Sequence, residues 1–183
     1  MRAAIRSVPD GRYGFADVID SGGAGAGPAR IVVAVTVAGD EVVFDFTGTD
    51  PQTPGPVNAV EAVTASAVLF ALRSAIAPDL AANGGSMRPV RLVAPAGSIV
   101  AARPPAAVGA GNVEVSQRIA DVCLGALAIA LPDRLGAASQ GTMNNLLVGG
   151  TGPSGPFVYY ETIGGGQGGR PGPRPGMHGV HTT

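Results

Sequence analysis

The chain has 183 residues, a formal net charge of −1 and apolar side chains at 45% of its positions. This length and apolar content suffice for one domain core, while the charge lacks the basic excess typical of nucleic-acid binders, so we expect no nucleic-acid partner. All twelve basic residues are arginines, which excludes a lysine Schiff base and the lysine of a phosphate-binding P-loop.

Cysteine usage and the apolar runs indicate the compartment. Cys123 is the only cysteine, so no disulfide can form within one chain, as is typical of a reducing compartment. The first twelve residues carry charge and lack the apolar core of a secretion signal. No apolar run reaches the roughly 18 residues that a membrane-spanning helix needs. We therefore expect a cytoplasmic protein with no membrane partner.

The first quarter of the chain predicts a short helix followed by an antiparallel meander. The helix ends before Pro9 and Asp10, and nothing in the sequence caps its start. Apolar alternation predicts strands at 12–19, 30–38 and 41–47. Gly39 and Asp40 suit a two-residue hairpin loop between the last two strands.

Two long helices follow, predicted by apolar residues that recur every three and four positions. They span about 57–77, ended by Pro78, and 114–131, ended by Pro132. Short strands are expected at 87–94, 98–102, 144–148 and 156–163. This order predicts a mixed α+β fold with mainly antiparallel sheets.

The uncapped first helix indicates a fragment of a larger fold. We expect residues 1–163 to form the core of its catalytic domain. Residues 164–183 are then a glycine- and proline-rich segment of the same domain, which the chain carries only in part.

The glycine run from Gly164 to Gly169 invites comparison with phosphate-binding loops, because consecutive glycines can present backbone N–H groups to an anion. Pro171 and Pro173 prevent the helix that a nucleotide-binding fingerprint requires. The run therefore predicts a tight loop in which backbone packs against backbone, or a loop that faces a substrate, in preference to a phosphate-binding loop. Its candidate positions are Gly164, Gly165, Gly166 and Gln167.

Glu161 and His181 are the candidate catalytic residues. Glu161 ends a strand beside the glycine run, where either chemistry or a solvated carboxylate is expected. His178 and His181 alone supply too few ligands for a metal site, so no metal ligand is assigned. Cys123 lies among apolar helix positions and is expected to be an inert, buried thiol. Further substrate- or loop-facing candidates, each at an element boundary where capping and turn roles serve equally well, are Asp45, Asn58 and Asn144.

Several strings, taken in order, resemble one enzyme family. They begin with VFDFTGTDPQ at 43–52 and GPVN at 55–58, and continue through NGG at 83–85, PAGS at 95–98, PPAAV at 104–108, QRI at 117–119, PDR at 132–134 and AASQGT at 137–142. They end with YE at 160–161, GGGQGG at 164–169 and HGVHT at 178–182. The set resembles the hydantoinase B/oxoprolinase family over essentially the whole chain.

The resemblance implies part of the B-type component of an ATP-dependent N-methylhydantoinase, 5-oxoprolinase, or acetone or acetophenone carboxylase. In such systems an A-type (hydantoinase A-like) partner subunit or domain binds ATP and phosphorylates a carbonyl oxygen, and the B-type part carries the activated species onward. The expected function is therefore hydrolysis of a cyclic amide, a hydantoin or 5-oxoproline.

The resemblance leaves two alternatives open, a ketone carboxylase subunit or a non-catalytic interaction part of such a complex. It also implies that any divalent metal is held by ligands outside these residues. The 183 residues alone are expected to be inactive.

Overall fold

Alternating apolar residues build a four-stranded sheet in the first part of the chain. Its strands are β1 (Gly11–Ile19), β2 (Ala29–Ala38), β3 (Glu41–Asp45) and β4 (Val90–Val93), in the order β1-β2-β3-β4. The first three form the predicted antiparallel meander, and β4 then pairs with β3 in parallel. A parallel neighbour needs a long crossover, which the first long helix provides. The computed structural model in which these elements are seen describes residues 1–172 and 174–180.

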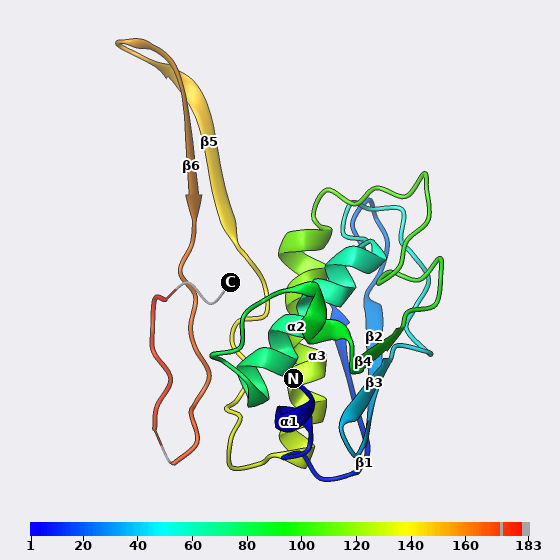
Figure 1. Cartoon of the computed structure of the whole chain (residues 1–183). Coiled ribbons are helices and arrows are strands. Elements are labelled where there is room, and N and C mark those ends of the chain that lie inside the picture. The colour runs from blue at the N-terminus through cyan, green and yellow to red at the C-terminus, as the bar shows by residue number, and fades with distance from the viewer. Residues whose placement is uncertain (173, 181–183) are drawn as a thin grey trace. The chain divides into compact units, whose positions relative to one another are not determined.

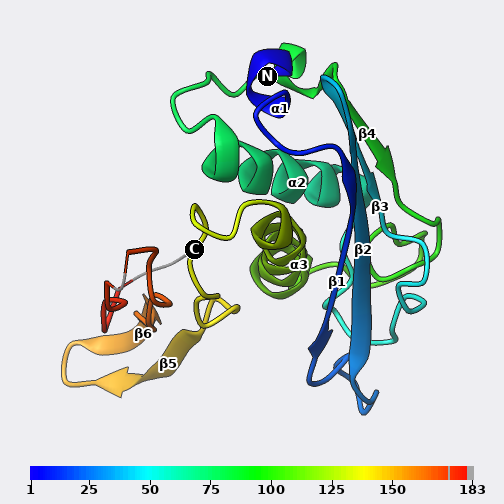
Figure 2. The same cartoon turned by 90° about the horizontal axis from the view of Figure 1, so that it is seen from below.

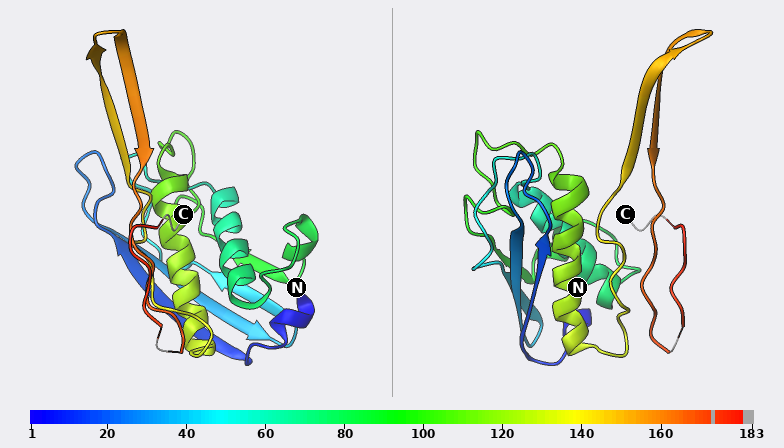
Figure 3. Two further views of the ribbon diagram at one scale, coloured as in Figure 1. Left: turned by 90° about the vertical axis from the view of Figure 1, so that its left-hand side faces the viewer. Right: turned by 180° about the vertical axis from the view of Figure 1, so that it is seen from behind.

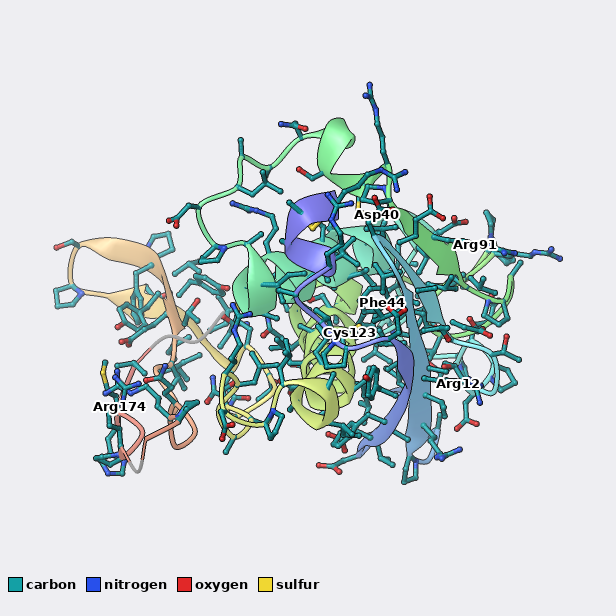
Figure 4. All side chains as sticks on the ribbon, turned by 60° about the horizontal axis from the view of Figure 1, so that its bottom comes forward. Arg12, Asp40, Phe44, Arg91, Cys123 and Arg174 are labelled. Carbon is teal, nitrogen blue, oxygen red and sulfur yellow. The ribbon has the colours of Figure 1, made fainter. Side chains whose placement is uncertain are left out.

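The predicted long helices are α2 (Glu61–Ile76) and α3 (Ser116–Ala130), and both lie on one face of this sheet (Figure 2). The inward positions of β2 and β3, among them Val33, Val35 and Phe44, are completely buried against them. The labelled side chains of Phe44 and Cys123 lie between the sheet and α3 (Figure 4). This layer of helices on one sheet face confirms the predicted mixed α+β fold.

The starts of both long helices differ from the prediction. Residues 57–59 form a buried segment that is not helical, in which the N–H of Ala59 donates to the carbonyl of Ile99 at 2.8 Å. Helix α2 therefore begins only at Glu61. Helix α3 is preceded by one π-helical turn, η2 (Gly111–Val115), and so the helical stretch starts earlier than residue 114.

The strand predicted at 98–102 is wrong. Gly97 has a positive φ of 86°, and the N–H of Ser98 donates back to the carbonyl of Pro95. The N–H of Ala101 donates in turn to the carbonyl of Ser98, and these local turns interrupt the regular ladder of bonds that a strand makes with a neighbour. Isolated contacts with distant segments remain, among them a bridge between Pro51 and Ser98 and a hydrogen bond from the N–H of Ile99 to the carbonyl of Asp50. The strand predicted at 87–94 begins late, because the 3-10 turn η1 (Gly84–Met87) precedes β4.

The chain divides into two compact units, Met1–Leu135 and Gly136–Thr183 (Figure 1). The first also contains the short predicted N-terminal helix α1 (Arg2–Ile5). The second contains a long hairpin of β5 (Asn145–Gly152) and β6 (Gly155–Thr162), followed by the glycine-rich segment (Figure 3). The hairpin and the glycine-rich segment thus belong to one unit, and the division expected after residue 163 stays a prediction.

No helix in residues 1–172 and 174–180 is long and apolar enough to cross a membrane. Within the same residues, no group of three or more His, Cys, Asp or Glu side chains is placed to hold a metal ion.

Candidate functional site

The glycine-rich segment pairs with the chain that follows it. The N–H of Gly165 donates to the carbonyl of Val180 at 3.1 Å, and the N–H of Gln167 donates to that of Met177 at 2.9 Å. The N–H of Gly179 returns a bond of 2.7 Å to the carbonyl of Gly165. These N–H groups are therefore engaged with carbonyl oxygens, and they do not form a free nest for an anion.

Close backbone contacts explain the glycines in this segment. A Cβ at Gly168 would lie 2.1 Å from the carbonyl oxygen of Ala137, and one at Gly164 would lie 2.8 Å from that of Gly179. Any side chain at these positions would push two backbone segments apart. The geometry supports the first of the two sequence-based alternatives, a loop in which backbone packs against backbone.

Glu161 lies in β6, directly opposite Leu146 of β5. Its carboxylate accepts a hydrogen bond from the hydroxyl of Tyr159, two residues earlier on the same side of the strand. This hydrogen bond, together with the charge of Glu161, raises the pKa of the Tyr159 phenol, because loss of the proton would place a second negative charge beside the carboxylate. Both side chains are exposed, so the pair is accessible from solvent.

A second polar cluster occupies the other face of the same hairpin. The Oδ1 atom of Asn145 accepts hydrogen bonds from the hydroxyls of Tyr160, at 2.7 Å, and Thr162, at 3.0 Å. The predicted Asn144 precedes it, and its backbone carbonyl accepts from the N–H of Ile163 at 2.8 Å. Sequence reasoning missed Asn145, although the two-residue alternation of the hairpin places its side chain beside those of Tyr160 and Thr162.

Asn58 is completely buried in the first unit. Its Nδ2 group donates to the carbonyl oxygens of Thr53, Gly55 and Ala107, each at 2.9 Å. Its Oδ1 atom accepts from the N–H of Thr53 at 2.7 Å. The side chain therefore faces loops, and it joins the segment after β3 to the segment before α3.

Asp45 ends β3 and belongs to the face of the sheet that the helices leave open. Its carboxylate accepts a hydrogen bond of 2.9 Å from the N–H of Thr47. Hydrogen bonds from Thr47 are the main reason why its pKa is lowered, and the charges of Arg12 and Arg91 lower it further. These two arginines project on the side of the sheet away from the helices (Figure 4).

The same open face has a shallow groove of about 540 Å³ along β1 and β2. Small residues form much of its floor, and arginines lie toward its two ends. Its lining includes Arg12, Gly14, Ala16, Arg30, Val32 and Ala34. Sequence reasoning did not find this groove, because it depends on which small residues the strand register places side by side.

The structure thus brings some candidates together and leaves others apart. The second unit contains Glu161, Asn144 and the loop positions 164–167, while Asp45 and Asn58 belong to the first unit. His181 lies outside the described residues. Cys123 is completely buried, and this burial raises the pKa of its thiol far above the usual range, as expected for an inert side chain.

Comparisons with known proteins agree with the resemblance seen in the sequence. The chain is 47% identical over 131 residues to 5-oxoprolinase 1 of Arabidopsis thaliana, which covers 72% of this chain and 10% of that protein. It is 40% identical over 147 residues to 5-oxoprolinase of Saccharomyces cerevisiae, which covers 76% of this chain and 11% of that protein.

A solved structure matches as well. The crystal structure of an ATP-dependent caprolactamase from Pseudomonas jessenii aligns with a TM-score of 0.78 and 26% identity, over 92% of this chain and 30% of that one. The chain therefore spans between about a tenth and a third of the length of these relatives. The model of the hydantoinase B/oxoprolinase family matches residues 1–183 of the chain. From this match and these identities, the chain belongs to the hydantoinase B/oxoprolinase family.

Proposed function

We propose that the chain forms part of the B-type portion of an ATP-dependent enzyme that opens cyclic amides, with a hydantoin or 5-oxoproline as substrate. The observation that carries this proposal is the 47% identity to a 5-oxoprolinase within a family match that spans every residue. The structural likeness to an ATP-dependent caprolactamase also supports cleavage of an amide bond within a ring, because a lactam is a cyclic amide.

The proposed chemistry divides the work between two polypeptides or domains. An A-type partner transfers the γ-phosphoryl group of ATP to the oxygen of the ring amide, which releases ADP. Water then adds to the activated carbon, and cleavage of the C–N bond opens the ring, with a proton going to the nitrogen and the phosphoryl group retained in an acyl phosphate. A second water hydrolyses this acyl phosphate to a carboxylate and inorganic phosphate. Phosphorylation favours this route because it turns a poor electrophile into one with a good leaving group.

Glu161 is the described side chain that we propose to serve this step, as a base toward the attacking water. It is an exposed carboxylate near the end of a strand, with its Tyr159 partner already in place and the glycine-rich loop immediately after it. Asn144, Gly164, Gly165, Gly166 and Gln167 are proposed to shape the surrounding loop. Asp45 and Asn58 are proposed to support loops of the first unit.

The test uses the complete B-type polypeptide co-purified with its A-type partner. Phosphate release that a hydantoin or 5-oxoproline stimulates, with the ring-opened product identified by mass spectrometry, is the expected result. Stimulation by a ketone plus bicarbonate alone would instead establish a carboxylase. The Glu161→Gln variant should lose turnover while Glu61→Gln, a matched change at an exposed position of α2, should retain it.

A further inference from the structure

The hairpin of β5 and β6 exposes large apolar side chains on both of its faces. One face carries Leu147, paired with Tyr160, and next to them Val158; these side chains are 67%, 59% and 77% exposed. The other face carries Val148, paired with Tyr159, and these are also exposed. Exposed aliphatic and aromatic side chains gathered in this way mark an interaction surface.

Both tyrosine hydroxyls of the hairpin already have partners within it. The hydroxyl of Tyr160 donates to Asn145, and that of Tyr159 donates to Glu161. Both rings can therefore be buried without leaving an unpaired hydroxyl group. Glu161 is the only charged residue between positions 145 and 163. This composition, aromatic and depleted in charge, is that of the core of an interface.

The strands also lack lateral neighbours. Within the described residues, β5 and β6 form a sheet of two strands with no third. A hairpin of two strands is at best marginally stable in water, and it gains stability when an apolar face is covered. Figure 3 shows this pair of strands as a long ribbon beyond the glycine-rich segment of its own unit.

Because both faces of the hairpin are apolar, only a partner that covers both of them at once can bury these side chains. A twofold contact with a second copy would use the same face of each hairpin, and the opposite face would remain in water. The relatives offer another source of cover. The caprolactamase match takes in 92% of this chain but only 30% of that one, and the yeast 5-oxoprolinase match takes in 11% of that protein. Outside the region that matches, each of these single chains therefore contains more than twice as much polypeptide as the match itself covers.

We propose that the β5–β6 hairpin is an arm held on both faces by polypeptide beyond residues 1–183 that belongs to the same longer chain. The enclosing surface is apolar where it meets Leu147, Val158 and Val148, and it stops short of the Glu161 carboxylate, which keeps its access to solvent. This inference concerns assembly alone, so it holds or fails independently of the proposed reaction.

Cysteine labelling tests the proposal directly. Cys123 is the only native cysteine of the 183 residues and is completely buried, so a cysteine introduced into the hairpin reports its own exposure. Val158→Cys probes one face and Val148→Cys the other. Maleimide labelling is followed for each peptide by mass spectrometry, in the 183-residue chain and in the complete B-type polypeptide without an A-type partner. Absence of label on Cys123 confirms an intact core in both.

The expected result is fast labelling at both positions in the 183-residue chain and labelling at least about tenfold slower at both in the complete polypeptide. Equal rates in the two proteins would overturn the proposal. Protection of the 183-residue chain that increases with its own concentration would assign the hairpin to a second copy instead. Protection of the complete polypeptide that arises only on addition of the A-type partner would assign the hairpin to that partner.

Discussion

The side-chain amide of Asn58 donates a 2.9 Å hydrogen bond to the carbonyl oxygen of Ala107, which lies 49 residues further along the chain. The same amide holds the carbonyls of Thr53 and Gly55, and the hydroxyl of Thr53 extends the contact to the carbonyl of Gly22. One buried side chain therefore fixes three loops that approach one another only in the folded unit.

Removal of this side chain should destabilise the first unit. In Asn58→Ala, an N–H group and three carbonyls lose their partner, and we expect a loss of about 2–4 kcal/mol. Asn58→Asp should be at least as harmful at neutral pH, because a carboxylate would then face three carbonyl oxygens. Urea unfolding followed by far-ultraviolet circular dichroism measures the free energy of unfolding of the first unit, since every helix of the described residues lies in that unit.

Asn144→Ala is the matched control for this measurement. It makes the same chemical change at an exposed position of the second unit, and the helical unfolding midpoint should not move. If Asn58→Ala unfolds at the wild-type urea concentration, the buried amide does not stabilise the loops.

Strands β2 and β3 were predictable because strict two-residue alternation leaves one interpretation of which face is buried. The start of α2 was not, because Val57 and Ala59 are as apolar as the helix that follows, and their non-helical form depends on Asn58 and on the distant Ile99. The strand predicted at 98–102 failed for a related reason. An apolar pattern cannot show that the backbone turns at Gly97, which has a positive φ, and turns again after it.

Gly111 should tolerate no side chain. A Cβ there would lie 2.1 Å from the carbonyl oxygen of Asn58, so Gly111→Ala must displace either the buried segment 57–59 or the π-helical turn before α3. We expect a loss of about 2–3 kcal/mol in the same urea experiment. Gly109→Ala is the control, because a Cβ at Gly109 meets nothing within 4 Å, and its stability should stay within about 1 kcal/mol of wild type. Equal effects of the two changes would refute the close approach.

Asp121 should make the first unit less stable as pH rises. Burial is the main cause that raises the pKa of this carboxyl above its ordinary value of 3.8, nearby Asp17 adds to the rise, and the cation of Arg118, 3.7 Å away, partly opposes it. The folded state then holds a proton that the unfolded state has lost, so stability falls as pH rises from 3.8 through the folded pKa.

Asp121→Asn removes this dependence. Its urea midpoint should exceed that of wild type at neutral pH, and the difference should shrink as the pH is lowered to 3.8 and below. Asp79→Asn, a change of the same kind at an exposed loop position, serves as the control. A wild-type advantage that grows toward neutral pH would show that the ion pair with Arg118 outweighs burial.

The sequence places Glu161 three residues before the glycine run, and the role of both in a site stays a prediction. It could not show that the N–H groups of Gly165 and Gln167 are used by Val180 and Met177, since those partners come from the far side of a proline-rich turn. The role of Asn145 could not be predicted, because its contacts with Tyr160 and Thr162 depend on the cross-strand register.

The pair of Glu161 and Tyr159 can be tested through the tyrosine. The carboxylate raises the pKa of the Tyr159 phenol, both as a hydrogen-bond acceptor and as a neighbouring charge. Glu161→Gln keeps an acceptor but removes the charge, so the pKa of Tyr159 should fall. Tyrosine-selective NMR over a pH titration, with Tyr159→Phe to assign the signal, measures the shift. Asp79→Asn should leave the Tyr159 titration where it is in wild type, and an unchanged Tyr159 pKa in Glu161→Gln would show that the two side chains do not interact in solution.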